Sequence, residues 1–362
     1  MKKKLFFVLA IVLGSFLSET KACTGITLRT LNSQPITART IEWAMEPLSI
    51  MYVVVPRGHK HKSMLPDGTS HGLRYQSKYG YVGIAVEDEH FVMEGVNEHG
   101  LAAGLFYFPD YGEYLSFDKS KKAVTISDFQ LVSWILASFS SIDELLVTLP
   151  NIRIVGLDSR ASTTHWRVTE ISGRQIVIEI VDQKLCVYEN TLGVLTNSPT
   201  FDWHMTNLNN YVNLKSGSVP QREIGFLKLR ALSGGSGLHG LPGDMTSPSR
   251  FVRAAFMQNT APVFESPQQT VIQAFHILNN FDIPIGLQFV DSDLVPDIHS
   301  ATQVTIATDL TNGCLYYRTA YNSHIRCIDL KKIDFTQVKY QFEYLELSPI
   351  EPIEQIDINY TS

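Results

Sequence analysis

The first regularly patterned stretch of the chain covers residues 23–43 and reads CTGITLRTLNSQPITARTIEW. Apolar and polar side chains alternate from Cys23 to Arg29, a turn-rich segment follows at 31–34, and the pattern resumes from Pro35 to Trp43. A period of two residues is typical of strands, and a short polar turn between two such runs indicates a β-hairpin. Cys23 is therefore expected at the first position of a strand.

A secretory signal is predicted ahead of this hairpin, at residues 1–22. Three lysines open the chain, an apolar run covers 5–13, and the small side chains of Thr20 and Ala22 stand where a signal peptidase cuts. Removal of the leader would make Cys23 the first residue of an exported protein, periplasmic or extracellular. A thiol nucleophile would then share one residue with an α-amine of unperturbed pKa about 7.7–8.0, which can serve as its base. A lipidated anchor and a structural cysteine are the alternatives.

Composition describes an ordinary globular protein whose mature chain is acidic. Of the 362 residues, 44% are hydrophobic and 18% are charged. The leader carries Lys2, Lys3, Lys4 and Lys21 against Glu19, a net charge of +3, so the formal charge of −6 becomes −9 after its removal. A negative surface argues against nucleic acid and anionic membranes as partners. No second apolar run approaches the ~20 residues that span a bilayer.

Four cysteines occur, at positions 23, 186, 314 and 327, without a Cys-x-x-Cys pair, so no structural zinc is expected. Cys314 and Cys327 stand symmetrically about a predicted turn, and an exported compartment permits disulfides. The sequence is compatible with a disulfide between these two cysteines and also with two free thiols.

Two further patterns are interpreted as loops rather than as binding sites. Residues 59–62 read HKHK and lack acidic or thiolate companions, which favours a solvated loop over a metal site. Residues 235–240 match the dinucleotide fingerprint G-x-G-x-x-G, but that motif needs a strand before it. Residues 224–232 ahead of it are predicted to be helical, so no cofactor is expected.

The order of predicted elements indicates an α+β fold. Strands are expected first, then helices at 127–139 and from 142 to Pro150, more strands between 163 and 188, helices at 250–257 and 270–280, and strands again up to 345. Ser141 to Glu144 reads as a capping box at the start of a helix. Two antiparallel sheets with helices packed outside, a four-layer αββα sandwich, would satisfy this order. Residues 23–362 are predicted to form a single domain with a C-terminal tail from about 348.

Six stretches resemble the choloylglycine hydrolase and penicillin V acylase family of N-terminal-nucleophile amidases. The resemblance runs from Cys23 to about Leu345, and the stretches around Asn197 and Arg250 are long and specific. The six are CTGITL (23–28), ARTIEW (38–43), NEHGL (97–101), GLFYFP (104–109), GVLTNSPTFDW (193–203) and GLPGDMTSPSRF (240–251). The resemblance implies the Ntn-hydrolase αββα sandwich and hydrolysis of a linear amide C–N bond.

The resemblance also implies roles for individual residues. Cys23 would attack the carbonyl, and Arg39 would favour its thiolate with a nearby positive charge. Glu42 occupies a position where the family usually carries Asp, and its carboxylate would hold the amine and thiol in register. Asn197 would donate its side-chain amide to the oxyanion, and Arg250 would order the hydrogen bonds of the nucleophile.

A further oxyanion position falls on Tyr107. The match at this point needs one inserted residue, so Phe106 is the rival. If the donor is the backbone N–H, the side chain is free to shape an aromatic acyl pocket.

The expected activity is therefore amide hydrolysis through a thioester on Cys23, without metal or cofactor. The substrate would be a small-molecule amide that joins an apolar acyl group to a small polar amine, such as a conjugated bile salt or penicillin V. An N-acyl homoserine lactone is an alternative substrate, and a lipid-anchored or sensor-type binding protein without turnover is an alternative of another class. The resemblance further implies a homo-oligomer, a tetramer or dimer.

Overall fold

The computed structural model describes residues 23–43, 48–158, 162–285, 287–288, 301–348, 350–351, 353–356 and 358. The predicted signal at 1–22 lies outside the described residues. Within the described part of the tail after 348 there is no helix or strand. None of the described helices combines the length and the apolar character needed to cross a membrane.

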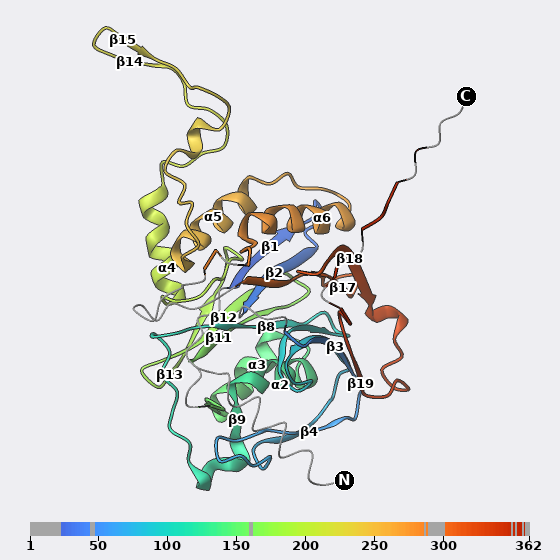
Figure 1. Cartoon of the computed structure of the whole chain (residues 1–362). Coiled ribbons are helices and arrows are strands. Elements are labelled where there is room, and N and C mark those ends of the chain that lie inside the picture. The colour runs from blue at the N-terminus through green and yellow to red at the C-terminus, as the bar shows by residue number, and fades with distance from the viewer. Residues whose placement is uncertain are drawn as a thin grey trace.

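Two antiparallel sheets form the centre of the molecule (Figure 1). The smaller sheet has the strand order β1 (Cys23–Arg29), β2 (Pro35–Trp43), β16 (Ala301–Asp309), β17 (Cys314–Thr319) and β18 (Asn322–Asp329). The larger sheet has the order β13 (Lys184–Glu189), β12 (Gln175–Val181), β11 (Thr164–Thr169), β8 (Ala102–Tyr107), β7 (Val92–Asn97), β6 (Tyr81–Val86), β3 (Ile50–Val55) and β19 (Gln341–Tyr344).

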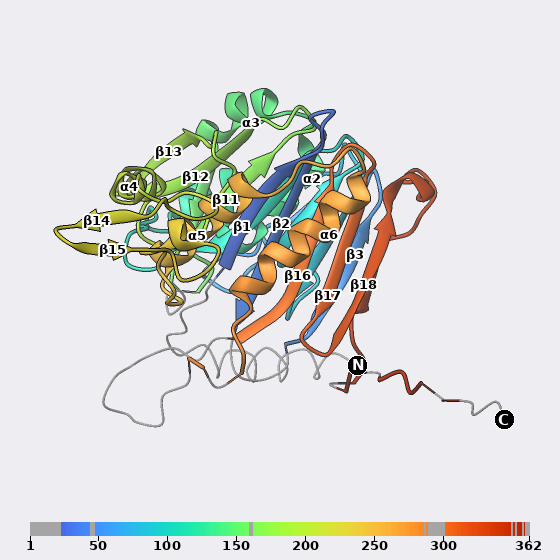
Figure 2. The ribbon, with the colours of Figure 1, turned by 90° about the horizontal axis from the view of Figure 1, so that it is seen from above.

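Helices cover the outer face of each sheet. Two of them, α5 (Ser247–Thr260) and α6 (Pro267–Leu278), lie on the smaller sheet and cross β1, β2 and β16 (Figure 2). Two more, α2 (Leu131–Ser138) and α3 (Ile142–Thr148), lie on the side of the larger sheet, where α2 packs against β7 and β8. The predicted four-layer αββα sandwich is confirmed.

Smaller elements lie around these layers. They are the pair β4 (Lys60–Lys62) and β5 (Arg74–Gln76), the parallel pair β9 (Thr125–Ser127) and β10 (Arg153–Val155), the pair β14 (Arg222–Ile224) and β15 (Leu227–Leu229), the helix α4 (Phe201–Asn207), and the 3-10 helices Lys119–Val124, Asp128–Gln130, Leu149–Asn151, Leu208–Tyr211, Ser236–Leu238, Asn279–Phe281 and Leu330–Lys332.

The local signals that the sequence carries are largely followed. Ser141 caps α3, its Oγ accepting from the backbone N–H of Glu144, and Pro150 lies in the 3-10 turn that ends this helix. The helix predicted at 270–280 begins at Pro267, with Ser266 as its N-cap. Strand β3 was not predicted, because its run IMYVVV has no polar residue to reveal a period of two.

The helix predicted at 224–232 is wrong. Strands β14 and β15 form an antiparallel hairpin there, with Ile224 paired to Leu227 across a two-residue turn. Gly225 has a φ of 57° in that turn, which glycine adopts without strain. The hairpin projects from the body of the molecule (Figure 1), so a helix at this position would have no apolar surface against which to pack.

All four cysteines are free in the structure. Cys314 pairs with Asp329, whereas Cys327 pairs with Tyr316. The register is therefore two residues off the symmetric arrangement considered from the sequence, and the two cysteines are diagonal rather than opposite neighbours. The two thiols are free, and their side chains lie within hydrogen-bonding reach of each other.

Candidate active site

Strand pairing brings Asn197 next to Cys23. Cys23 is buried at the first position of β1, with 2% of its surface exposed. Gly25 and Leu195 form an isolated antiparallel bridge, their backbone N–H groups donating to each other's carbonyls at 2.7 and 3.1 Å. Continuing this register by two residues places Asn197 opposite Cys23, although 174 positions separate the two in sequence.

The side-chain amide of Asn197 joins three parts of the site. Its Oδ1 accepts from the Cys23 main-chain nitrogen at 2.8 Å and from Nη2 of Arg250 at 2.7 Å. Its Nδ2 donates to the carbonyl of Tyr107 at 2.8 Å. Two donors face Oδ1 and an acceptor faces Nδ2, so the partners determine which way the amide points.

Arg250 reaches Cys23 from the first turn of α5. The residue is buried, and Nη1 donates to the carbonyl of Cys23 and to Oγ1 of Thr24, the latter at 2.8 Å. Nε donates to the carbonyl of Met245 at 2.9 Å. The planar guanidinium is therefore held at three positions and fixes the start of β1 against α5.

Arg39 lies between the two sheets, fully buried, as the register partner of Gly25. Nη1 donates to the carbonyl of Leu105 at 2.6 Å and to Oε2 of Glu94 at 3.3 Å. The guanidinium also stacks on the ring of Phe106, 3.8 Å from the centroid. A permanent positive charge is thus kept in the low-dielectric space beside β1.

Glu94 forms a buried charge triad that the sequence reasoning missed. Its carboxylate bridges Arg39 and Arg167, each at 3.3 Å, and all three residues are almost fully buried. Gly104 makes room for it, since a Cβ there would lie 1.9 Å from Oε2 of Glu94. Gly25 makes room for Arg167 in the same way, at 2.7 Å from Nη1. A charged residue inside an otherwise buried strand is the signal that could have pointed to the triad.

Burial has the largest effect on the pKa of the Cys23 thiol. Desolvation raises its pKa above the ordinary value and outweighs the opposing effects of Arg39 and Arg250. Glu42 raises the pKa further, and a hydrogen bond from the backbone N–H of Tyr107 lowers it. Arg39 lowers this pKa, as a nearby positive charge does, but the net shift is upward and favours the neutral thiol.

Glu42 is buried in β2 but does not hold the Cys23 nitrogen, a contact that Asn197 makes instead. Its Oε1 accepts from Oγ1 of Thr302 at 3.1 Å, and its Oε2 is buried without a hydrogen-bond partner. Alternation along the strand puts Glu42 on the face of β2 opposite to Arg39. Burial raises the pKa of this carboxyl to about 7, against an opposing effect of Arg250.

Tyr107, rather than Phe106, contributes its backbone to the site. The Tyr107 N–H faces the Cys23 sulfur and its carbonyl accepts from Asn197. Phe106 points between the sheets, where its ring carries the Arg39 guanidinium. The structure thus brings together Cys23, Tyr107, Asn197 and Arg250, with Arg39 beside them.

Two contacts hold the backbone of Asn197. Nε2 of His204 lies 2.8 Å from the Asn197 carbonyl, and the Asn197 N–H donates to Oγ of Ser247 at 2.9 Å. Burial lowers the pKa of His204 to about 4, so the ring is neutral near pH 7 and Nε2 carries the donated hydrogen. The ring also stacks on Phe251, with centroids 4.6 Å apart, so His204 is a packed histidine.

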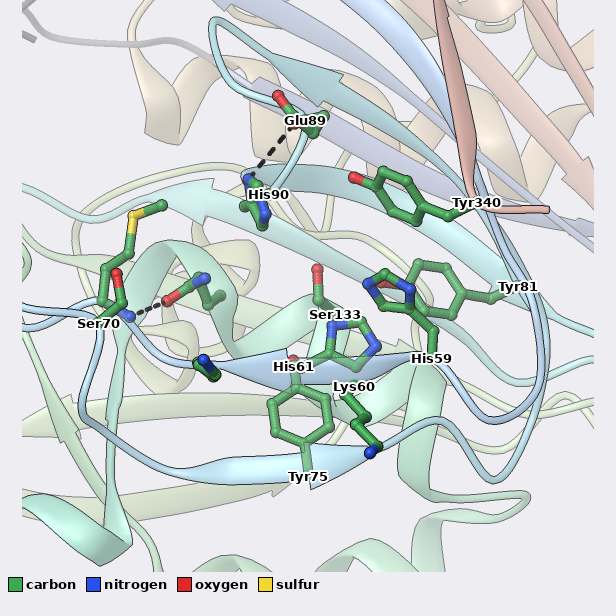
Figure 3. Close-up of a pocket in the computed structure, with 13 residues that line it drawn as sticks. His59, Lys60, His61, Ser70, Tyr75, Tyr81, Glu89, His90, Ser133 and Tyr340 are labelled. Atoms are coloured by element: carbon green, nitrogen blue, oxygen red, sulfur yellow. Dashed lines mark hydrogen bonds and ion pairs between the residues drawn. The ribbon is translucent and has the colours of Figure 1, made fainter. Parts of the chain in front are cut away.

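A separate cavity of about 250 Å³ lies on the α2 side of the larger sheet (Figure 3). His59, His61 and His90 line it together with Tyr75 and Tyr340. His61 stacks on Tyr75, His59 stacks on Tyr340, and burial lowers the pKa of both histidines. The HKHK segment is therefore partly packed rather than a fully solvated loop.

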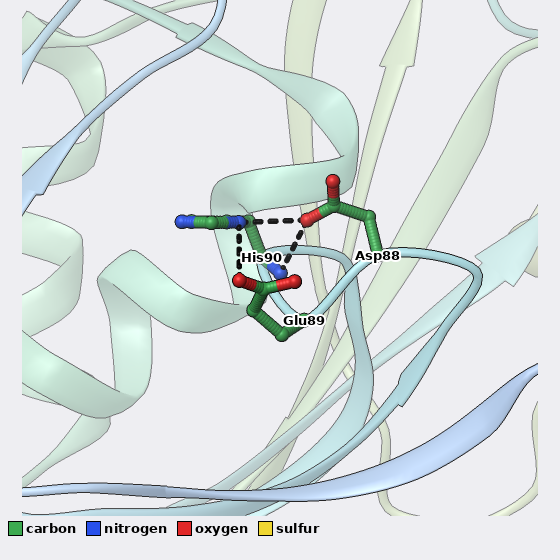
Figure 4. A group of neighbouring side chains, drawn as sticks. All are labelled: Asp88, Glu89 and His90. Carbon is green, nitrogen blue, oxygen red and sulfur yellow. Dashed lines mark hydrogen bonds and ion pairs between the residues drawn. The ribbon is translucent and has the colours of Figure 1, made fainter. Parts of the chain in front are cut away.

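The structure also brings acidic neighbours to this cavity, which the sequence had not suggested. Asp88, Glu89 and His90 form a group whose potential ligand atoms lie within 4.8 Å of one another (Figure 4). Nδ1 of His90 lies 2.7 Å from Oδ1 of Asp88, which also accepts from the His90 backbone N–H. These hydrogen bonds are local contacts within one turn, so we do not assign a metal site to this group.

Comparison with known proteins identifies the family to which the chain belongs. The model of the family "Linear amide C-N hydrolases, choloylglycine hydrolase family" matches residues 23–341. A bile salt hydrolase/transferase of Clostridium perfringens is 36% identical over 88% of this chain and 95% of its own length. A penicillin V acylase of Pectobacterium atrosepticum is 27% identical over 94% and 89%.

Solved structures show the same likeness. A variant of conjugated bile acid hydrolase from Clostridium perfringens superposes with a TM-score of 0.79 at 31% identity, covering 92% of this chain and all of that one. Penicillin V acylase from Agrobacterium tumefaciens shares the fold, with a TM-score of 0.73 at 24% identity over 90% and 92% of the two chains. The chain belongs to the choloylglycine hydrolase family of linear amide C–N hydrolases.

Proposed function

We propose that this hydrolase works through a thioester on Cys23, formed after residues 1–22 have been removed. The observation that carries the proposal is the convergence on Cys23 of three groups: the Tyr107 N–H, the Asn197 amide and the Arg250 guanidinium. Acyl transfer requires groups of this kind around the attacked carbonyl. They come from distant parts of the sequence: Tyr107 lies 84 positions after Cys23, and Arg250 lies 227 positions after it.

The first step needs a base, because burial keeps the thiol protonated. The α-amine of a processed Cys23 takes the thiol proton while Sγ attacks the substrate carbonyl carbon. Oδ1 of Asn197, which lies 2.8 Å from this nitrogen, orients the amine toward the thiol.

Charge then develops on the carbonyl oxygen. The Tyr107 N–H, which already faces the Cys23 sulfur, can donate a hydrogen bond to this carbonyl oxygen. Nδ2 of Asn197 carries two hydrogens, and among the described residues only the Tyr107 carbonyl accepts from it, which leaves one hydrogen for the oxyanion. The α-ammonium returns its proton to the departing amine, and the thioester remains.

Water completes the reaction. The amine accepts a proton from a water molecule as the oxygen attacks the thioester carbon, and the proton then goes to the leaving Sγ. The carboxylic acid departs and the free thiol is restored. Every proton moves through the nitrogen of Cys23, so a chain with a residue ahead of Cys23 lacks the base.

The substrate joins an apolar acyl group to a small polar amine. The names of the relatives favour a conjugated bile salt or penicillin V. An N-acyl homoserine lactone has the same two halves and is kept as a test substrate. Export to the periplasm or medium is proposed on the leader pattern alone.

We further expect a homo-oligomer built through the hairpin β14–β15. Its turn residue Phe226 is fully exposed, as is Leu232 just beyond β15, and Leu227 is largely exposed. Apolar side chains on a projecting arm are typical of contacts between copies of a chain.

Light scattering tests this assembly. The parent should be a tetramer or dimer, and the double variant Phe226→Ser, Leu232→Ser should be a monomer. Val147→Ser, at an exposed valine on α3, is the control; a monomeric parent would refute the assembly.

Amine release by the mature protein tests the activity. Penicillin V, glycocholate, taurocholate and an acyl homoserine lactone are compared with a Cys23→Ala control. Turnover of any of them, absent in the control, supports the proposal and identifies the acyl preference. Intact mass separates the alternative of a lipid-anchored binding protein, since simple cleavage leaves residues 23–362 unmodified. Binding without turnover, at an affinity unchanged in Cys23→Ala, would favour a sensor.

A further inference from the structure

His165 lies on β11, fully buried, directly opposite Phe106 in the strand pairing. Nε2 of its ring lies 3.1 Å from the carbonyl of Thr196, and Nδ1 lies 3.0 Å from Oε1 of Glu179. A carbonyl oxygen can only accept, so Nε2 must carry a hydrogen. Both ring nitrogens are engaged, which excludes His165 as a free base and makes it a fixed connection between two segments.

Glu179 secures the other end of the same segment. Its Oε1 also accepts from the backbone N–H of Phe201, the first residue of α4, at 3.0 Å. The His165–Glu179 pair is therefore hydrogen-bonded to the chain at Thr196 and at Phe201, on either side of Asn197. Glu179 is completely buried, and its Oε2 has no hydrogen-bond partner.

The His165 ring also contacts the residue that follows Tyr107, whose N–H is the second proposed oxyanion donor. Phe108 stacks on His165 with ring centroids 4.6 Å apart and planes 10° apart. Phe108 follows Tyr107, whose N–H faces the Cys23 sulfur. One imidazole is thus in contact with a neighbour of each proposed donor, Thr196 beside Asn197 and Phe108 beside Tyr107.

We propose that His165 and Glu179 are positioning residues that set the spacing between the Asn197 amide and the Tyr107 N–H. The proposal rests on the function proposed above, because that function makes these two groups the oxyanion donors. Oxyanion stabilisation depends on donors that are already in place before the charge forms. A fully buried pair that contacts the chain next to both donors supplies that preorganisation.

The kinetic test uses His165→Gln, with His324→Gln on exposed β18 as the matched control. We expect kcat to fall by about tenfold or more with KM changed by less than about twofold, because the lost interaction belongs to the transition state. The control should match the parent. A loss confined to KM, or no loss, would overturn the proposal.

A double variant separates positioning from general damage. Since His165 is proposed to act through both Asn197 and Tyr107, His165→Gln should cause a smaller fold-loss of kcat in an Asn197→Ala background than in the parent, because coupled residues are non-additive. The same fold-loss in both backgrounds would overturn the proposal. Glu179→Gln, which keeps an oxygen acceptor for Phe201, should lose less kcat than Glu179→Ala; the reverse order would contradict the hydrogen-bond account.

Hydrogen exchange tests the geometry independently of turnover. His165→Gln should speed exchange of the amides in 195–201 by about tenfold while leaving those of β16 unchanged, since local openings of a segment need not involve the rest of the fold. Unchanged exchange in 195–201 would overturn the inference. If the parent shows no amidase turnover on any substrate, the proposed function fails, whereas this measurement still reports on the positioning pair.

Discussion

Replacing Glu42 by Gln should change how the stability of the protein depends on pH. The carboxyl is buried, and its pKa in the folded protein is about 7, compared with an ordinary value of 4.5. Below pH 4.5 it is protonated in both the folded and the unfolded chain. As pH rises from 4.5 to 7, the unfolded chain ionises while the folded carboxyl keeps its proton, so the free energy of unfolding falls.

The magnitude follows from the two pKa values. The gap between 4.5 and about 7 corresponds to on the order of 3 kcal/mol of stability, present below pH 4.5 and lost by about pH 7. Gln has nearly the same shape and does not titrate. The stability of Glu42→Gln relative to the parent should therefore rise by that amount across this window.

Urea unfolding at a series of pH values between 4 and 8 measures the difference. Asp128, whose pKa burial also raises to about 7, contributes equally to parent and variant and cancels. Glu265→Gln, at an exposed position, is the matched control and should show a flat difference. A flat or falling difference for Glu42→Gln would refute the assignment of a desolvated carboxyl.

Three further outcomes are expected. Asn197→Ala should lower kcat by about 10²–10³, measured by amine release, with the protein still folded; a loss below tenfold would remove Asn197 as an oxyanion donor. Glu94→Gln leaves Arg39 and Arg167 without a counter-charge and should cost about 3–5 kcal/mol in urea unfolding, whereas an unchanged midpoint would contradict a buried triad. A chain that retains one residue ahead of Cys23 should be inactive in the same amine-release assay, and full turnover would exclude the α-amine as base.

The predictable part of the site consists of residues that stand in the stretches resembling the family. The ARTIEW and GVLTNSPTFDW stretches pointed to Arg39 and Asn197, and both lie near Cys23. The triad of Glu94 and Arg167 was missed, because its members come from different strands and become partners only when the two sheets pack. The Glu42 contact was misjudged for a similar reason, since side-chain alternation in β2 turns it toward Thr302.

The sequence by itself determined the strands and helices with a clear period, the hairpin that begins at Cys23, and the four-layer order of elements. These depend on spacing along the chain, which the letters record directly. Only the tertiary structure decided the pairing of Gly25 with Leu195, the offset of Cys314 from Cys327, and the hairpin β14–β15. It also decided that burial outweighs two arginines at the Cys23 thiol. Register and desolvation arise from segments that meet across the fold, and no local pattern contains them.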